Sequence, residues 1–139
     1  MLSARILIVE DNPSDVYILR RALLDQGEEF DLEIASDGEQ AIQFIHSERK
    51  KPQDTHPCVV LLDLHLPKLD GLEVLRAFRQ EPVLRHIQVV VMTGGASPQE
   101  EAELRRMGAD YRPKPTGLSE FDDLAADLIA ICKESPAAA

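Results

Sequence analysis

The sequence predicts an α/β protein built on a parallel sheet with helices on both of its faces. Short apolar runs alternate five times with segments whose apolar residues have helical spacing. The run at residues 58–62, CVVLL, is apolar without interruption, which is typical of a strand buried on both faces of a parallel sheet. We expect one domain over residues 1–139, with its core at about 4–133 and a frayed tail at 134–139.

Composition limits the classes of partner. The chain has 15 basic and 25 acidic residues, which gives a net charge of -10. This balance argues against binding to the phosphate backbone of nucleic acids, so no nucleic-acid partner is expected. No apolar run approaches the roughly 18 residues of a membrane span, and no signal peptide precedes the first apolar run. We therefore expect a cytoplasmic protein that has no membrane partner.

The two cysteines, Cys58 and Cys132, are far apart in the sequence and lack the spacing of a metal site or a CxxC motif. A domain of this length can build an apolar core without a crosslink. We expect both cysteines to be small buried hydrophobic residues that stay reduced, as is usual in the cytosol.

Start and stop signals agree with the apolar periodicity. Asn12 and Pro13 are typical of a helix start and Gly27 of a helix end, which predicts a helix over about 13–26. Ser36-Asp37-Gly38 is a turn and cap before a second helix. The predicted strands are 5–9, 30–35, 58–62, 87–92 and 110–113; the other predicted helices are 71–80, 98 to about 107, and 118–133.

Two polar segments are expected on the surface. Residues 47–57, SERKKPQDTHP, contain two prolines and predict a long surface loop. The helix near 98–107 has a thin apolar stripe, so it should be the most weakly held, and its exposed face is either a partner surface or a plain solvated one. The histidines lack metal-ligand spacing and are expected to be surface or loop residues; they are His46, His56, His65 and His86.

Strands that alternate with amphipathic helices imply parallel pairing with right-handed crossovers. The expected solution is a flavodoxin-like, doubly wound (βα)5 sheet with strand order 2-1-3-4-5, in which the strand at 30–35 lies at an edge. Ligands of such sheets bind at the carboxyl ends of the strands, near the point where the strand order reverses.

Polar residues follow four of the predicted strands, and this topology places them all at the same edge of the sheet. Asp63 is the clearest case, because Asp is depleted in strands and a buried, unpaired carboxylate is costly. Three carboxylates in one cleft need a hard cation, and Mg²⁺ is bound in proteins by one or two carboxylates together with phosphate oxygens. The set consists of Glu10, Asp11, Asp63, Thr93 and Lys114.

A Lys and a Thr hydroxyl opposite these acids suit an anion added to the site. The residues therefore point to a phosphoryl group carried on a carboxylate, with a metal ion and a Lys to stabilise its charge. Glu10-Asp11, Asp63 in LLDLHLP, Asp70-Gly71, Thr93 and Lys114-Pro115 occur in the order typical of one family. Over residues 4 to about 133, the chain resembles the receiver domain of two-component response regulators.

The resemblance implies a role for each residue around the metal. It makes Asp63 the phosphoacceptor. It also implies an Mg²⁺ site, with Mn²⁺ as an alternative, in which Asp11 binds directly and Glu10 through a water. The main-chain carbonyl of His65 would complete the ligands from the protein.

The resemblance also implies a switch. Thr93 and Lys114 would bind phosphoryl oxygens, and Tyr111 would turn inward in the activated state. Two departures from the family pattern bear on Tyr111: the segment before it is one residue shorter than usual, and Pro113 directly precedes the Lys. A static, half-buried Tyr111 therefore remains the alternative. Gly94, where Ala is common, should leave the acceptor accessible.

The function implied is a switch rather than an enzyme, with at most weak self-dephosphorylation. The donor would be a sensor histidine kinase or a phosphotransfer protein, and the output would be contact with an unknown downstream protein, because no output domain follows. A homodimer through 98–107, 110–113 and 118–133 is a further expectation. The opening EDNPSDVYILRRAL and the long polar loop look like stand-alone receivers, including those that serve phytochrome-type kinases.

Two alternatives stay open from the sequence. One is a pseudo-receiver, an interaction module that is never phosphorylated. The other is a haloacid-dehalogenase-like phosphohydrolase; such enzymes place a second Asp two residues after the nucleophile, where this chain has His65, and no cap domain is present.

Overall fold

The five apolar runs form the five strands of one parallel sheet, whose order is β2-β1-β3-β4-β5. The computed structural model describes residues 4–134. The predicted flavodoxin-like topology is confirmed, and β2 lies at an edge as expected. The strands are β1 (Ala4–Val9), β2 (Phe30–Ala35), β3 (Val59–Asp63), β4 (Gln88–Thr93) and β5 (Asp110–Pro113).

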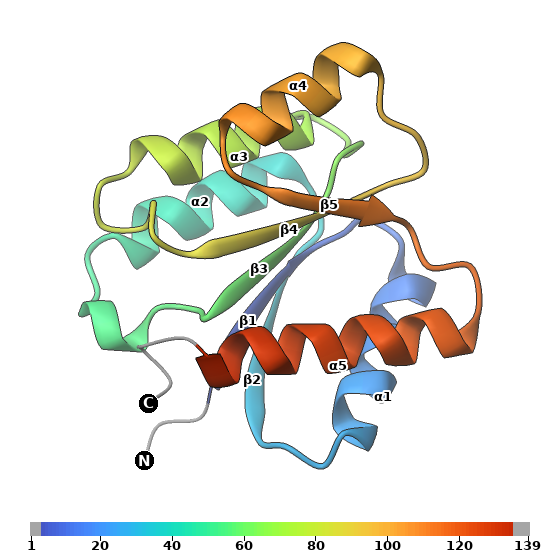
Figure 1. Ribbon diagram of the computed structural model, residues 1–139. Helices are drawn as coiled ribbons and strands as arrows, with labels where there is room; N and C mark the ends of the chain where they lie inside the picture. Colours follow the sequence, from blue (N-terminus) through green and yellow to red (C-terminus); the bar gives the residue numbers. More distant parts are fainter. Residues whose placement is uncertain (1–3, 135–139) are drawn as a thin grey trace.

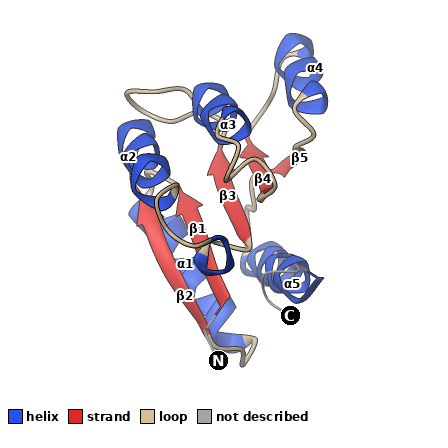
Figure 2. Ribbon diagram, turned by 90° about the vertical axis from the view of Figure 1, so that its left-hand side faces the viewer, coloured by secondary structure: helices blue, strands red, loops and turns tan. Residues whose placement is uncertain are grey.

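The helices form two layers around the sheet. Helices α2, α3 and α4 lie along one face, and α1 and α5 lie together on the other (Figures 1 and 2). Their bounds are α1 (Pro13–Asp25), α2 (Gly38–Glu48), α3 (Gly71–Gln80), α4 (Pro98–Arg106) and α5 (Leu118–Glu134). None of these helices is both long and apolar enough to cross a membrane.

The core is divided by the sheet into two apolar layers. Successive residues of a strand point to opposite faces. In β3, Val60 and Leu62 therefore join the layer under α2, α3 and α4, whereas Val59 and Leu61 join the layer under α1 and α5. All five residues of β3 are buried, which agrees with the central position that its unbroken apolar run predicts.

Helix α4 has a capping box at its amino end and few contacts with the core. The Ser97 side chain accepts a hydrogen bond from the Glu100 N–H, and the Glu100 carboxylate accepts one from the Ser97 N–H, which forms a capping box. Pro98 occupies the first turn, where its missing N–H does no harm. Leu104 is the buried residue of this helix, in agreement with the thin stripe in the sequence.

The polar segment 47–57 is in part the surface loop that its composition predicts, since residues 49–54 are exposed, but its two ends are not. Helix α2 extends to Glu48, and a 3₁₀ turn, η1 (Gln53–Thr55), precedes β3. Glu48 and His56 are buried. The reason is a network of compensating contacts: the Arg5 guanidinium donates to both Glu48 oxygens and to the Thr55 carbonyl. His56 Nε2 lies 2.9 Å from the Glu48 carbonyl oxygen, so the buried imidazole has a partner as well.

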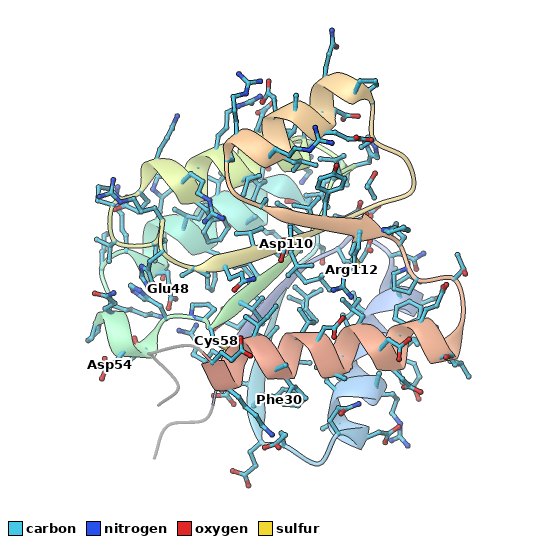
Figure 3. The ribbon with its side chains drawn as sticks, viewed as in Figure 1. Phe30, Glu48, Asp54, Cys58, Asp110 and Arg112 are labelled. Carbon is cyan, nitrogen blue, oxygen red and sulfur yellow. A yellow bond between two sulfur atoms is a disulfide. The ribbon has the colours of Figure 1, made fainter. Side chains whose placement is uncertain are left out.

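The expectation of two separate, reduced cysteines is wrong for this structure. Cys58, just before β3, and Cys132, in the last turn of α5, form a disulfide with their Cα atoms 5.0 Å apart. Figure 3 labels Cys58 beside the end of α5. A separation of 74 residues in the sequence carries no spacing signal, because the fold alone brings the two elements together. Of the frayed tail predicted at 134–139, Glu134 is the last residue of α5, and 135–139 lie outside the described residues.

Candidate functional site

The carboxyl ends of four neighbouring strands meet at one edge of the sheet and form the candidate site there. Asp63 is the last residue of β3 and Thr93 the last of β4. Glu10 follows β1 directly, and Lys114 follows β5. The register of the parallel pairs, with Val9 opposite Leu62 and Thr93 opposite Pro113, brings these ends level with one another.

Three carboxylates come together at this edge. One oxygen each from Glu10, Asp11 and Asp63 lies within 4.8 Å of the others. Glu10 and Asp63 are buried, whereas Asp11 is exposed at the start of the loop before α1. Three like charges at this spacing repel one another unless a cation lies among them.

Lys114 supplies one positive charge to this cluster. Its Nζ lies 3.0 Å from Asp63 Oδ2, 3.1 Å from Glu10 Oε1 and 3.9 Å from Asp15 Oδ2. Burial disfavours the charged ammonium, but the hydrogen bonds and negative charges of Asp63 and Glu10 outweigh burial and raise the pKa of Lys114 above its usual value. Lys114 is therefore a permanent cation, and it leaves the cluster with a surplus of negative charge.

The buried carboxyl of Glu10 has a raised pKa, to which the neighbouring negative charge contributes. Burial raises the pKa of Glu10 to about 7, against the hydrogen bond from the Asn12 N–H and with a further upward push from the charge of Asp63. Oε2 accepts that hydrogen bond at 3.1 Å, and the buried Oε1 lies 3.1 Å from Lys114 Nζ, an ammonium that it shares with Asp63. An oxygen of this kind beside two more carboxylates fits a small, hard cation such as Mg²⁺.

The loop after β3 fixes the orientation of the Asp63 side chain. The His65 N–H donates to Asp63 Oδ1 at 3.1 Å, and the Leu64 N–H donates to the Met92 carbonyl at 2.9 Å. Gly71 closes the loop against the strand: a Cβ at this position would lie 2.6 Å from the carbonyl oxygens of both Asp63 and Leu64. Only glycine fits this approach without a shift of the backbone.

The rim contains contacts that sequence reasoning did not find. His65 Nε2 lies 3.2 Å from the Gly95 carbonyl oxygen, which links the loops that follow β3 and β4. Thr93 is buried, and its hydroxyl oxygen accepts a hydrogen bond from the Gly95 N–H at 3.0 Å. Within residues 4–134 the Thr93 hydroxyl thus contacts its own loop rather than the acids. A contact between two loops that are distant in the sequence leaves no spacing pattern by which it could be predicted.

Tyr111 lies on β5, away from the acids and against α4. Its hydroxyl lies 3.4 Å from Glu101 Oε2, to which it donates, and it accepts from Arg105 at 3.2 Å. The ring is half-buried and packs on the core layer under α4. Tyr111 therefore couples β5 to α4.

Comparison with known proteins now identifies the family. The model of the "Response regulator receiver domain" matches residues 6–125. Response regulator MprA of Mycobacterium ulcerans is 34% identical over 145 aligned positions, which cover 94% of this chain and 58% of MprA. Response regulator Rcp1 of Synechocystis sp. is 39% identical over 88 residues, which cover 63% of this chain and 60% of Rcp1. In these two sequence alignments the chain covers less than two thirds of the length of either relative.

Solved structures with the same fold extend the likeness. The Mn²⁺-bound form of response regulator Rcp1 matches with a TM-score of 0.78 and 29% identity, over 91% of this chain and 92% of Rcp1. The phosphorylated cyanobacterial phytochrome response regulator RcpA matches with a TM-score of 0.79 and 27% identity, over 91% of each chain. Together with the family model and the strand order, these matches show that the chain belongs to the receiver domain family of response regulators.

Proposed function

We propose that Asp63 accepts a phosphoryl group from the phosphohistidine of a sensor kinase or a phosphotransfer protein, and that the reaction requires Mg²⁺. One observation carries the proposal: Glu10, Asp11 and Asp63 gather within 4.8 Å of one another, and Lys114 lies between two of them. Three carboxylates and one ammonium leave an excess of negative charge that a bound cation would neutralise. The proposal is further supported by the likeness to a phosphorylated phytochrome regulator.

The residues of the chain divide the work of the transfer. An oxygen of the Asp63 carboxylate attacks phosphorus, the new P–O bond forms, and the P–N bond to the donor histidine breaks with its electron pair staying on the imidazole. The His65 N–H holds Oδ1, so the carboxylate is oriented before the donor arrives. Lys114, now 3.0 Å from Oδ2, transfers its hydrogen bonds to a phosphoryl oxygen as charge develops there.

Asp11 and Glu10 would hold the metal, with Asp11 as a direct ligand and Glu10 acting through a water. The main-chain carbonyl of His65 would complete the protein ligands. When bound, the ion neutralises charge on the acids and on the phosphoryl oxygens. Mg²⁺ is the ion proposed, and Mn²⁺ is an alternative that the Mn²⁺-bound Rcp1 structure supports.

The signal is proposed to leave the site through Thr93 and Tyr111. The Thr93 hydroxyl would exchange its hydrogen bond from Gly95 for one to the phosphoryl group. Movement of the loop after β4 would then reach α4, where Tyr111 binds Glu101 and Arg105. The output is contact with a downstream protein, or a homodimer, through α4, β5 and α5, in the cytoplasm.

Phosphorylation with a small acyl phosphate such as acetyl phosphate tests the proposal. We expect the intact mass to rise by one phosphoryl group only when Mg²⁺ is present, and the label to be lost in base. Asp63→Asn should abolish labelling. Asp70→Asn is the matched control. Asp70 lies in the loop that follows Asp63 and is the N-cap of α3, a position at which Asn caps as well as Asp.

Each other result identifies a different function. Failure of the wild type to accept phosphate from acyl phosphates and from a phosphorylated kinase would indicate a pseudo-receiver. Continuous release of phosphate from varied phosphomonoesters would indicate a phosphohydrolase. Retention of the label in Asp63→Asn would place the acceptor elsewhere.

Lys114→Ala separates metal binding from switching. The ammonium repels a cation, so its removal should leave Mg²⁺ affinity intact or higher. The phosphorylated variant should lack the change in hydrogen exchange that we expect in α4 of the wild type. Loss of Mg²⁺ binding in Lys114→Ala would contradict the role given to this residue.

A further inference from the structure

We propose that Cys58 and Cys132 form a reversible thiol–disulfide site, which low-molecular-weight disulfides such as oxidised glutathione convert to the crosslinked form that attaches α5 to the sheet. The proposal concerns the amino end of β3 and is independent of phosphoryl transfer. Asp63 lies five residues further along the same strand, so the crosslink and the acid cluster are about 16 Å apart.

Geometry and position favour a crosslink between these two residues. Their Cα atoms are 5.0 Å apart, within the range that a disulfide spans without backbone movement. Cys58 follows the loop that leads into the central strand, and Cys132 lies two residues before the end of α5. The bond therefore joins the middle of the sheet to the last turn of a helix whose inner face packs through apolar side chains and which also forms the ion pairs Arg112–Asp127 and Lys133–Glu28.

The surroundings also accommodate the reduced pair. Both cysteines are buried in the apolar layer under α1 and α5, where Val59, Leu128 and Ile129 lie as well. Cys58 Sγ lies 3.2 Å from the Arg5 carbonyl oxygen, so its thiol has an acceptor inside the protein when the bond is open. Since each face of the sheet has its own apolar layer, we expect the fold to persist without the crosslink. A pair that is stable in both states is suited to reversible chemistry.

The order of the chemistry follows from access. Cys132 is the more readily exposed of the two, because the last turn of a helix opens at lower free energy than a central strand. Its thiolate attacks the glutathione disulfide, forming a mixed disulfide and releasing one glutathione thiolate. The Cys58 thiolate then attacks the Cys132 sulfur of the mixed disulfide and releases the second glutathione. Two protein thiols are oxidised and one glutathione disulfide is reduced. The two protons lost by the protein thiols are taken up by the two glutathione thiolates that are released.

The crosslink should change stability and the local opening of α5. It closes a loop of about 75 residues that contains everything from β3 to α5. In the unfolded chain this constraint removes entropy, which for a domain of this size corresponds to a rise in melting temperature on the order of 10 °C. In the folded chain it prevents the last turn of α5 from separating from β3.

The first experiment uses the wild-type protein in both redox states. After equilibration with oxidised glutathione, we expect the intact mass to fall by two hydrogens and both thiols to resist alkylation in denaturant. Dithiothreitol should restore both thiols and lower the melting temperature by about 10 °C, measured by circular dichroism. Hydrogen exchange at the end of α5 should accelerate on reduction. Thiols that stay alkylatable in oxidised glutathione, or equal melting temperatures in the two states, would overturn the proposal.

The single variants test the order of attack. Cys58→Ala should accumulate one glutathionyl group on Cys132, because the resolving thiol is missing. Cys132→Ala should be modified at Cys58 at least tenfold more slowly. Equal rates in the two variants would contradict the assignment of Cys132 as the attacking residue. Neither variant should melt at a higher temperature in oxidised glutathione than in dithiothreitol, and both should bind Mg²⁺ like the wild type.

Discussion

The two ends of the sheet each bury a glutamate, but the two carboxylates are neutralised in different ways. At the amino ends of the strands, both oxygens of Glu48 accept hydrogen bonds from Arg5, and Lys51 lies 3.4 Å away. At the carboxyl ends, Glu10 has no cation of its own among the described residues, because it shares the ammonium of Lys114 with Asp63.

The difference teaches how a structural cluster differs from a binding site in the same fold. Around Glu48 the opposite charges are matched, so little repulsion is left for a bound cation to relieve; the cluster consists of Arg5 and Lys51 with Glu33 and Glu48. Around Glu10, three acids face one Lys, so binding of a cation relieves repulsion. Substitutions can remove the charge balance around Glu48, or reveal the excess of negative charge around Glu10.

The largest effect is expected from Arg5→Met. Removal of the guanidinium leaves the carboxylate of Glu48, whose side chain is 1% exposed, without its main partner. We expect a loss of about 3 kcal/mol in the free energy of unfolding, measured with urea under reducing conditions. Mg²⁺ affinity should stay within twofold of the wild type.

A double variant serves as the control for Arg5→Met. In Arg5→Met/Glu48→Leu the buried charge is gone, so a substantial part of the lost stability should return. If the double variant is less stable than Arg5→Met, the Arg5–Glu48 pair is not the reason for the loss.

Glu10→Gln should act in the opposite direction on stability. At pH 8 the metal-free variant should gain roughly 1 kcal/mol over the wild type, because a buried charge and its repulsion by Asp63 are removed. Mg²⁺ affinity, measured by calorimetry, should fall about tenfold, or ~1.4 kcal/mol. A variant that loses stability without metal would show that Glu10 is structural, like Glu48.

Acidification should weaken metal binding through the same residue. The pKa of Glu10 is raised to about 7 without metal, so a cation must displace its proton at lower pH. We expect Mg²⁺ affinity to be flat above pH 7 and to fall by up to about tenfold per pH unit below it. In Glu10→Gln this dependence should be reduced.

The raised pKa of Glu10 also gives the sign of the effect on metal-free stability. Because the folded state holds the proton more tightly than the unfolded state, this residue lowers stability as pH rises from 4.5 to about 7, and its effect is constant above that. The stability difference between wild type and Glu10→Gln across this range isolates the effect. A difference that does not change with pH would contradict the raised pKa.

The smallest effect is expected from Tyr111→Phe. The hydroxyl binds Glu101 and Arg105 at an exposed position, so its removal should cost no more than about 0.5 kcal/mol. Tyr17→Phe, on the exposed face of α1, is the matched control. Urea unfolding measures both. A loss of 2 kcal/mol or more in Tyr111→Phe would mean that the hydroxyl supports more of α4 than these contacts indicate.

The order of the strands and the gathering of the acids could be predicted because both follow from chain connectivity. A sheet of repeated βα units brings the carboxyl ends of its strands to one edge, so Glu10, Asp63 and Lys114 had to be neighbours once the topology was known. The roles proposed for these residues in metal binding and phosphoryl transfer stay predictions.

The parts that could not be predicted depend on contacts between elements that are distant in sequence. The pairing of Cys58 with Cys132 needs the position of the end of α5 against β3, which no local pattern contains. The burial of Glu48 had a signal that composition obscured: Ala41, Ile45 and Glu48 lie on one helix face at i, i+4 and i+7. A charged residue that continues the apolar face of a helix can therefore be buried if another element supplies an opposite charge, as Arg5 does for Glu48.

The capping box of α4 bears on how a rearrangement could pass through this part of the molecule. The capping box satisfies the N–H groups of Ser97 and Glu100 within the segment itself, and Leu104 is the buried residue of the helix. A segment built in this way can roll or slide over the sheet as a rigid rod, keeping its internal hydrogen bonds while it exchanges one set of neighbours for another.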